Sequence, residues 1–300
     1  MERIKQALEK ARLERQQTGG AYVPSASSDA GISEPVTYTH TRTVGVAKNF
    51  MQERRIVSGS DQDTFTDAYK ILRTQVLQRL SEKNWNSLAI TSPGINEGKT
   101  LTAINLAISL SMEISYTVLL VDADLRHPSV HSYFGIDAEY GLSDYLLTNK
   151  PLSELLIHPK EIPGFVILPG GKPVGNSAEM LSSPKMVRLV QELKSRYPSR
   201  IILFDLPPLL SAADTLAFSP YVDAALLVIE DGKTQAEDAK RAIELLQGTN
   251  VIGTVLNKSW HNRQEVESTS GNWPDRLWNN AQLVRAAVMS GFSRLRRKKS

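Results

Sequence analysis

Six short aliphatic runs constrain the fold of this chain more than any other feature. Continuous apolar runs of this length are typical of strands that are buried on both faces, as in a parallel sheet. They are "SLAIT" (87–91), "TVLLVD" (117–122), "FVILP" (165–169), "RIILFD" (200–205), "AALLVIE" (224–230) and "VIGTVLN" (251–257). Helical patterns separate them, with start signals at Ser183-Pro184 and at the capping-box pair of Thr234 and Glu237. Residues 61–258 are therefore predicted to form a doubly wound α/β domain with a mostly parallel sheet.

The segments on either side of this domain differ from it in composition. Residues 1–17 have the periodicity of a short amphipathic helix, whereas residues 18–60 are rich in Ser, Thr, Gly and Pro and are expected to form a flexible linker. Residues 259–300 begin as a polar segment and continue as a basic amphipathic helix. The chain closes on "RLRRKKS", with five basic side chains in seven residues. Such a tail fits an anionic membrane surface or an acidic partner.

The composition excludes several classes of site. The 300 residues include no cysteine, which rules out disulfides, Fe–S clusters and cysteine-ligated zinc and is typical of a reducing cytoplasm. His127 and His131 lie four apart, but no third metal ligand accompanies them. Nucleic-acid binding is not predicted, because the basic tail has no interleaved aromatic residues. Without an apolar run of membrane-spanning length or a signal peptide, the sequence predicts a cytoplasmic protein.

One loop has the composition of a phosphate-binding loop. The segment "ITSPGINEGKT" (90–100) lies between a predicted strand and a predicted helix, and it ends in Gly-Lys-Thr. Free backbone N–H groups and the helix dipole favour an anion at such a position. In this pattern Lys99 is expected to neutralise the β- and γ-phosphates, and the Thr100 hydroxyl is expected to bind Mg²⁺. The loop is a variant, because Pro93 stands where the standard pattern has its first glycine and Gly94 follows it.

Carboxylates follow two of the predicted strands. Asp122 and Asp124 come at the end of "TVLLVDAD", and Asp205 ends "RIILFD". The carboxyl ends of parallel strands share the edge of the sheet where such folds bind ligands. A single aspartate at a strand end often only caps the next turn. Three of them together with a phosphate loop predict a site for a magnesium–nucleotide complex.

The order of these motifs resembles that of the bacterial tyrosine kinases (BY-kinases) of capsule and exopolysaccharide synthesis. The match covers about residues 61–258, and its motifs are "SPGINEGKT", "VLLVDADLRHPSVHSYFG", "GLSDYL", "LPGG", "AEMLSSPKM", "FDLPP", "DAALLVIEDGKT" and "GTVLNKS". The most specific part is "VDADLRHP", which is similar to the family's second Walker motif. The opening "MERIKQALEKA" resembles the stand-alone members associated with exosortase-type polysaccharide loci.

The resemblance implies a P-loop NTPase fold of the deviant Walker type, as in MinD and ParA. It also implies a protein-tyrosine kinase that uses ATP and Mg²⁺ and phosphorylates itself. In that family pattern Asp124 would bind the metal, Asp122 would orient or deprotonate the attacking tyrosine hydroxyl, and Asp205 would support the metal shell. Asn257, at the end of the last strand, would contact adenine. The residues expected around the nucleotide are Gly94, Asn96, Glu97, Gly98, Lys99, Thr100, Leu101 and Asn257.

The resemblance implies partners as well. The helix that contains "DAYKILRT" matches the one that the family uses to join subunits, so a homo-oligomer is expected. Asp67, Lys70 and Arg73 are spaced to share one face of it. The family pattern is Glu, Arg, Arg, and a lysine lacks the bidentate fork of arginine. Stand-alone members act with a membrane chain-length-determinant (polysaccharide co-polymerase) protein, so this chain is expected at the inner face of the membrane through that partner.

Two departures from the family pattern affect these expectations. Family members usually end in a cluster of tyrosines that they phosphorylate, whereas no tyrosine follows Tyr221 here. Tyr22 and Tyr38, in the expected linker, are candidate acceptors in their place. Leu206 replaces a threonine of the family, which is expected to remove a hydroxyl beside the metal site.

Two other functions stay open at this point. A ParA/MinD-type positioning ATPase shares the fold and the amphipathic C-terminal helix. Those proteins carry an extra lysine five residues before the invariant one, where this chain has Gly94. The other alternative is an ATP-binding regulatory subunit of the co-polymerase without kinase activity. The missing tyrosine cluster favours that reading, and the retained aspartates oppose it.

Overall fold

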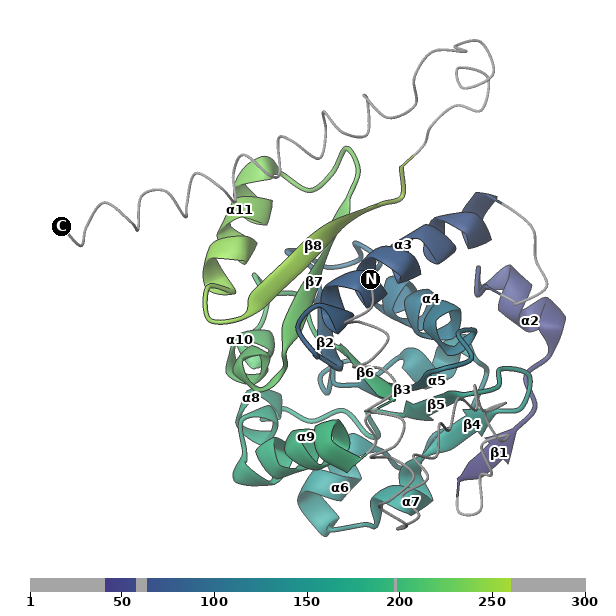
Figure 1. Cartoon of the computed structure of the whole chain (residues 1–300). Helices are drawn as coiled ribbons and strands as arrows, with labels where there is room; N and C mark the ends of the chain where they lie inside the picture. The colour runs from purple at the N-terminus through teal and green to yellow at the C-terminus, as the bar shows by residue number, and fades with distance from the viewer. Residues whose placement is uncertain (1–40, 58–63, 197–198, 260–300) are drawn as a thin grey trace, which may run out of the picture. The chain divides into compact units, whose positions relative to one another are not determined.

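The computed structural model describes residues 41–57, 64–196 and 199–259, which include an eight-stranded sheet in the order β1-β4-β5-β3-β6-β2-β7-β8 (Figure 1). Neighbouring strands are parallel, except that β4 and β5 pair antiparallel. The strands are β1 (Arg42–Val44), β2 (Ser87–Thr91), β3 (Thr117–Asp122), β4 (Ile157–Pro159), β5 (Phe165–Leu168), β6 (Arg200–Asp205), β7 (Ala224–Glu230) and β8 (Asn250–Asn257). The amphipathic helices predicted near the two ends of the chain lie outside the described residues.

All six aliphatic runs form strands, which confirms the predicted sheet. From β2 the chain first builds β3 and β5 on one side, then inserts β6 between β3 and β2, and finally adds β7 and β8 on the other side. The direction of winding therefore changes at β2. In open α/β sheets, ligands bind beyond the carboxyl ends of the strands at such a switch point.

Helices cover both faces of the sheet, as the doubly wound class requires (Figure 1). Alternate strand residues face different layers: Ile201 and Leu203 of β6 belong to the core under α3, α4 and α5, whereas Ile202 and Phe204 belong to the core under α8 to α11. Of the described helices, none combines the length and the apolar character that crossing a membrane needs. The helices are α2 (Lys48–Glu53), α3 (Thr64–Ser81), α4 (Lys99–Ser111), α5 (Val130–Tyr133), α6 (Leu142–Thr148), α7 (Leu152–Leu155), α8 (Ser177–Leu181), α9 (Pro184–Arg196), α10 (Asp214–Phe218) and α11 (Ala236–Leu245).

Residues 41–57 pack into the domain, although composition predicts a flexible linker there. β1 extends the sheet beside β4, and α2 follows it. Asn105 of α4 fixes the end of the segment, because its Oδ1 accepts the Val57 N–H and its Nδ2 donates to the Arg55 carbonyl, both at 2.9 Å. The buried apolar side chains of the segment are Val46, Met51, Ile56 and Val57. The packed domain therefore includes residues before position 61, and the linker expectation is wrong for this part of the chain.

Of the two predicted helix start signals, the structure confirms one and contradicts the other. At α9, the Ser183 Oγ accepts the Met186 N–H at 3.2 Å, which confirms the predicted start. At α11, the N-cap residue is Gln235, and no side chain caps the helix. The capping box predicted for Thr234 is therefore wrong, and the Thr234 hydroxyl is used in a contact with the phosphate loop instead.

Candidate active site

The phosphate loop lies at the carboxyl edge of the sheet, between β2 and the start of α4. β6 and β7 flank β2, so the loop lies between the carboxyl ends of both neighbours. α4 begins at Lys99 and has 13 residues, nearly all of them buried. Its N-terminus therefore offers free N–H groups and the positive end of a helix dipole at the switch point of the sheet.

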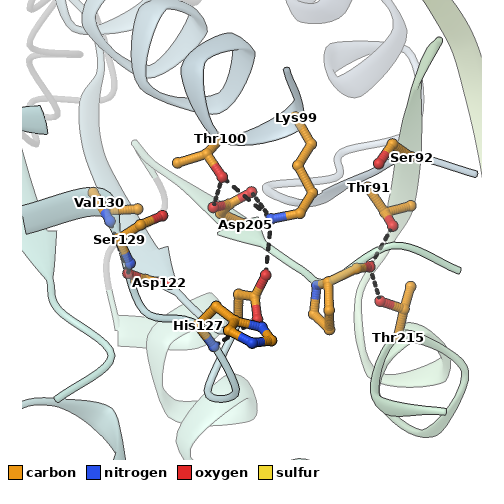
Figure 2. Close-up of polar contacts among 12 residues, drawn as sticks. Thr91, Ser92, Lys99, Thr100, Asp122, His127, Ser129, Val130, Asp205 and Thr215 are labelled. Carbon is orange, nitrogen blue, oxygen red and sulfur yellow. Dashed lines mark hydrogen bonds and ion pairs between the residues drawn. The ribbon is translucent and has the colours of Figure 1, made fainter. Parts of the chain in front are cut away.

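Lys99 brings the predicted charged side chains together (Figure 2). Its Nζ donates to Asp124 Oδ2 at 2.9 Å and lies 3.6 Å from Asp205 Oδ1. The Thr100 hydroxyl donates to Asp205 Oδ2 at 2.7 Å and accepts from Lys99 Nζ at 3.2 Å. Thr100 and the two aspartates are buried, and only 13% of the Lys99 side chain is exposed. Side chains from α4, from the loop after β3 and from the end of β6 thus converge as the sequence predicts.

Asp122 belongs to the same cluster, but its carboxylate faces another helix. It is fully buried, and its Oδ2 accepts the N–H groups of Ser129 and Val130, at the start of α5, at 2.8 and 2.9 Å. Among the described residues its Oδ1 has no hydrogen-bond partner. Asp122 is also the register partner of Asp205 in the parallel β3–β6 pair. Two buried carboxyl groups therefore lie side by side at this edge of the sheet.

Burial and repulsion shift the pKa values of the cluster. The pKa of Asp122 rises from 3.8 to about 8, first because of burial and then because of Asp205. The pKa of Asp205 is also raised, because its burial outweighs the attraction of Lys99. Burial alone would lower the pKa of Lys99, but Asp205 and Asp124 raise it above its ordinary value. At neutral pH burial and the neighbouring carboxyl group therefore favour the protonated form of Asp122, while Lys99 stays charged.

The donor set fits a magnesium ion that arrives with a nucleotide. Mg²⁺ prefers oxygen ligands, and in nucleotide enzymes it is usually bound by one or two carboxylates together with substrate phosphates and water. Among the described residues, no three His, Cys, Asp or Glu side chains form a metal site of their own. Thr100, Asp124 and Asp205 supply oxygens for part of a shell, and within the described chain the buried Asp205 Oδ1 has no hydrogen-bond partner.

Two residues with left-handed backbone angles shape the phosphate loop. Asn96 has φ 62° and Gly98 has φ 90°, in the region that glycine and asparagine tolerate best. A second constraint acts on Gly98, since a Cβ there would lie 2.1 Å from Asn257 Nδ2. The backbone angle favours glycine at this position, and a Cβ there would also displace the Asn257 side chain from the loop.

The expected nucleotide residues Glu97 and Asn257 contact the loop itself. The Glu97 carboxylate accepts the Gly94 N–H at 2.9 Å and the Thr234 hydroxyl at 2.5 Å. Asn257 Nδ2 donates to the Glu97 carbonyl at 2.9 Å, and Lys258 Nζ donates to another loop carbonyl at 2.6 Å. The sequence analysis assigned Thr234 to a helix cap and did not single out Lys258, so neither contact with the loop was predicted. The position of Lys258 directly after Asn257 was the signal available for it.

Two leucines near the site have structural surroundings. Leu101 is half-buried in the first turn of α4. Leu206 is fully buried in the core on the face of the sheet opposite α4. The expectation that Leu206 removes a hydroxyl beside the metal site is therefore wrong, because this position faces away from the carboxylate cluster. The candidate acceptors Tyr22 and Tyr38 lie outside the described residues.

The three predicted interface residues do not share one free face. Asp67 and Lys70 form an exposed ion pair at 2.8 Å. Arg73, whose side chain is 18% exposed, donates to the Ser109 carbonyl at 3.1 Å and pairs with Glu113 at 2.9 Å. Arg73 therefore joins α3 to the end of α4 within one chain. The use of α3 in subunit assembly stays a prediction.

Comparison with known proteins decides the family. The CobQ/CobB/MinD/ParA nucleotide-binding domain matches residues 88–271. Over 209 residues the chain is 33% identical to the tyrosine-protein kinase YwqD of Bacillus subtilis, a match that covers 69% of this chain and 86% of that protein. The chain belongs to the bacterial tyrosine kinase family. It is also 31% identical over 203 residues to the tyrosine-protein kinase ptk of Acinetobacter johnsonii, where the match covers 67% of this chain but 27% of the relative.

Solved structures agree with this membership. The kinase domain of the Escherichia coli tyrosine kinase ETK superposes with a TM-score of 0.63 at 25% identity, over 80% of this chain and 94% of that domain. The septum site-determining protein MinD of Pyrococcus horikoshii, solved with Mg-ADP, superposes with a TM-score of 0.51 at 23% identity, over 60% and 72% of the two chains. The second likeness concerns the fold alone. The predicted P-loop fold and the predicted family are both confirmed.

Proposed function

We propose that this member of the bacterial tyrosine kinase family is a Mg²⁺- and ATP-dependent protein-tyrosine kinase that regulates exopolysaccharide or capsule synthesis. The observation that carries the proposal is the convergence of Lys99, Thr100, Asp124 and Asp205 on the phosphate loop. Phosphoryl transfer needs positioning and charge neutralisation more than covalent chemistry. These four side chains provide both at one point.

The basic and acidic residues of the site have different proposed roles in this reaction. The Lys99 ammonium pairs with phosphate oxygens when nucleotide is bound, which frees Asp124 and Asp205 from their ion pairs with it. Together with the Thr100 hydroxyl, those carboxylates would hold Mg²⁺, whose charge would offset that of the phosphates. Asn257 contacts the adenine base while its Nδ2 holds the loop. The free N–H groups of the first turn of α4 bind the phosphates.

Asp122 is proposed to orient the acceptor hydroxyl and take its proton. Its Oδ2 is fixed by two backbone N–H groups of α5, which leaves Oδ1 for this role. The raised pKa of Asp122 keeps the group protonated in the ligand-free protein. Since the charge of Asp205 is one cause of that pKa, neutralising Asp205 favours the ionised form of Asp122, in which it can act as a base.

The proposal extends to partners and location. The chain acts at the inner face of the membrane through a chain-length-determinant (polysaccharide co-polymerase) protein, as the family resemblance implies. A second subunit, joined through α3 as the family resemblance implies, is a further proposed partner. The basic residues at 294–300 provide charge for anionic lipid.

Mass spectrometry after incubation with Mg·ATP tests the proposed activity. We expect phosphotyrosine in the parent protein and none in Lys99→Met. The acceptors are expected at Tyr22 and Tyr38, and the double substitution with phenylalanine should remove the signal. Tyr69 provides an internal control that should stay unmodified, because it is buried, with 8% of its surface exposed.

A regulatory subunit without kinase activity is the second candidate. Among the 300 residues of the sequence, none after Tyr221 is a tyrosine that could accept phosphate, which favours it. Intact nucleotide binding without any phosphotyrosine, both alone and with the membrane partner, would overturn the kinase proposal and support this one.

A further inference from the structure

We infer that Thr234 is a positioning residue for the phosphate loop, and that it acts by turning the Glu97 carboxylate away from the bound nucleotide. The inference rests on the proposed nucleotide site and deepens it. Thr234 lies in the loop between β7 and α11, 137 positions along the chain from Glu97. Neither the local pattern nor the family resemblance assigned it this role.

The Thr234 hydroxyl has a defined direction. Its Oγ1 accepts the Glu230 N–H at 2.8 Å and lies 2.5 Å from Glu97 Oε1. An ionised carboxylate has no proton to donate, so the hydroxyl proton points to Glu97. The other carboxylate oxygen, Oε2, accepts the Gly94 N–H at 2.9 Å. Both oxygens of Glu97 are therefore held by donors, one from within the loop and one from the segment after β7.

Glu97 is an unfavourable residue for an anion-binding loop unless its charge is held in place. It stands two positions before Lys99 and is 5% exposed. A buried carboxylate needs hydrogen bonds, and a carboxylate that turned toward a phosphate would repel it strongly at the low dielectric of the site. The Thr234 hydroxyl and the Gly94 N–H satisfy the carboxylate without using Lys99. The lysine therefore stays available for the phosphates.

The backbone beside Glu97 is fixed from the same side. Asn257 Nδ2 donates to the Glu97 carbonyl, and Lys258 Nζ bridges the Asn96 carbonyl at 2.6 Å and Glu230 Oε2 at 3.1 Å. The ends of β7 and β8 thus hold residues 96 and 97 together. Within this arrangement, Thr234 provides the contact to the charged group, so its loss should change electrostatics more than loop shape.

Nucleotide binding tests the inference without relying on kinase activity. Thr234→Val keeps the side-chain shape but leaves Glu97 with one donor, so the Kd for Mg·ADP should rise about tenfold, the effect of one charge-assisted hydrogen bond. Thr234→Ser restores the hydroxyl and should bind as the parent does. Thr249→Val is the matched control, because the Thr249 hydroxyl donates to the Ser219 carbonyl at 3.0 Å, outside the loop network. The Kd of this control for Mg·ADP should stay within about twofold of that of the parent. Isothermal titration calorimetry measures the Kd of the parent and of the three variants.

Replacing Glu97 with a neutral residue shows whether Thr234 acts on the charge of the Glu97 carboxylate or has an effect that is independent of that charge. In a Glu97→Gln background, adding Thr234→Val should change the Kd by less than about twofold, because no carboxylate is left to turn. An unchanged Kd for Thr234→Val, or a tenfold loss in both backgrounds, would overturn the inference. Should Thr234→Val fold poorly by thermal unfolding, Thr234→Ala makes the same comparison. A parent protein that binds no Mg·ADP would instead refute the proposed function.

Discussion

Replacing Asp122 with asparagine should stabilise the ligand-free protein, and more strongly as the pH rises. The carbonyl of asparagine can accept the same N–H groups of Ser129 and Val130 that Asp122 accepts at 2.8 and 2.9 Å, so the contact with α5 survives. The substitution removes a buried carboxyl group whose ionisation the fold opposes. It therefore isolates the electrostatic cost of the carboxylate cluster.

The pKa of Asp122 sets the sign and the pH window. An unfolded chain ionises this carboxyl near its ordinary pKa of 3.8, whereas in the folded protein burial and then Asp205 raise the pKa to about 8. Below both values the group is protonated in either state and costs nothing. Between them the folded state binds more protons than the unfolded state, so the free energy of unfolding falls as the pH rises. Above about pH 8 this loss is complete.

The size of the stability difference follows from the width of the pH range between the two pKa values of Asp122. One proton contributes at most about 1.4 kcal/mol per pH unit, so a window of about four units gives an upper bound of roughly 6 kcal/mol. The effective dielectric of real protein interiors reduces this, and at about pH 8 we expect Asp122→Asn to be more stable than the parent by roughly 2–5 kcal/mol. At about pH 4 the difference should be small.

Urea unfolding from about pH 4 to 8, in EDTA and without nucleotide, measures this difference, and titrating groups that do not interact with Asp122 cancel. Asp223→Asn is the matched control. Although burial acts to raise the pKa of Asp223, hydrogen bonds from Lys194 and Ser87 hold it below its ordinary value. Asp223→Asn should therefore be less stable at neutral pH, with a deficit that shrinks as the pH falls. A pH-independent difference for Asp122→Asn, or a destabilisation that grows with pH, would refute the reasoning.

Three further predictions concern other parts of the chain. Gly98→Ala should lower the free energy of unfolding by about 2 kcal/mol and abolish Mg·ADP binding, because the new Cβ meets Asn257 Nδ2 at 2.1 Å; unchanged calorimetric affinity would contradict this. Asn105→Leu should cost about 1–3 kcal/mol, because the buried Val57 N–H loses its acceptor, and should expose the preceding segment to limited proteolysis; resistance equal to the parent would argue against this anchor. Binding of the basic tail (294–300) to anionic vesicles should weaken as salt rises, and salt-independent sedimentation would exclude an electrostatic contact.

Features that depend on short local patterns could be predicted from the sequence. Five of the six aliphatic strands could be recognised because both faces of a central strand are buried, which leaves no polar alternation. The sixth, β8, lies at the edge of the sheet and is only partly buried, although its sequence is also aliphatic. The charges of the site could be placed because strand ends in a parallel sheet share one edge. Lys99, Thr100, Asp124 and Asp205 therefore meet as expected, without any knowledge of side-chain geometry.

Two short strands on the β1 side of the sheet, of which β1 is the edge, could not be predicted in this way. β1 reads Arg-Thr-Val and β4 reads Ile-His-Pro, each with three residues and no apolar run. β1 is recruited by pairing with β4, and the segment after it is recruited by the buried amide of Asn105. Such contacts join residues far apart in the chain, so a composition typical of linkers does not exclude packing.

Two residue roles were missed for the same reason. Thr234 fits a local capping rule, but the unsatisfied charge of Glu97 offers its hydroxyl a stronger partner. Arg73 has the spacing of a surface residue, but the Ser109 carbonyl near the end of α4 and the Glu113 carboxylate bind its guanidinium. In both cases a tertiary partner outweighed the local preference.

The central claim is that Lys99, Thr100, Asp124 and Asp205 bind a nucleotide together with Mg²⁺. The most direct measurement is calorimetric titration with ADP in Mg²⁺ and in EDTA, for the parent and for Asp205→Asn. We predict that Mg²⁺ tightens binding to the parent by at least about tenfold, or about 1.4 kcal/mol. Asp205→Asn should lose most of that gain while it binds ADP in EDTA at least as well as the parent. Equal affinity of the parent in Mg²⁺ and in EDTA, or no binding in either, would contradict the account.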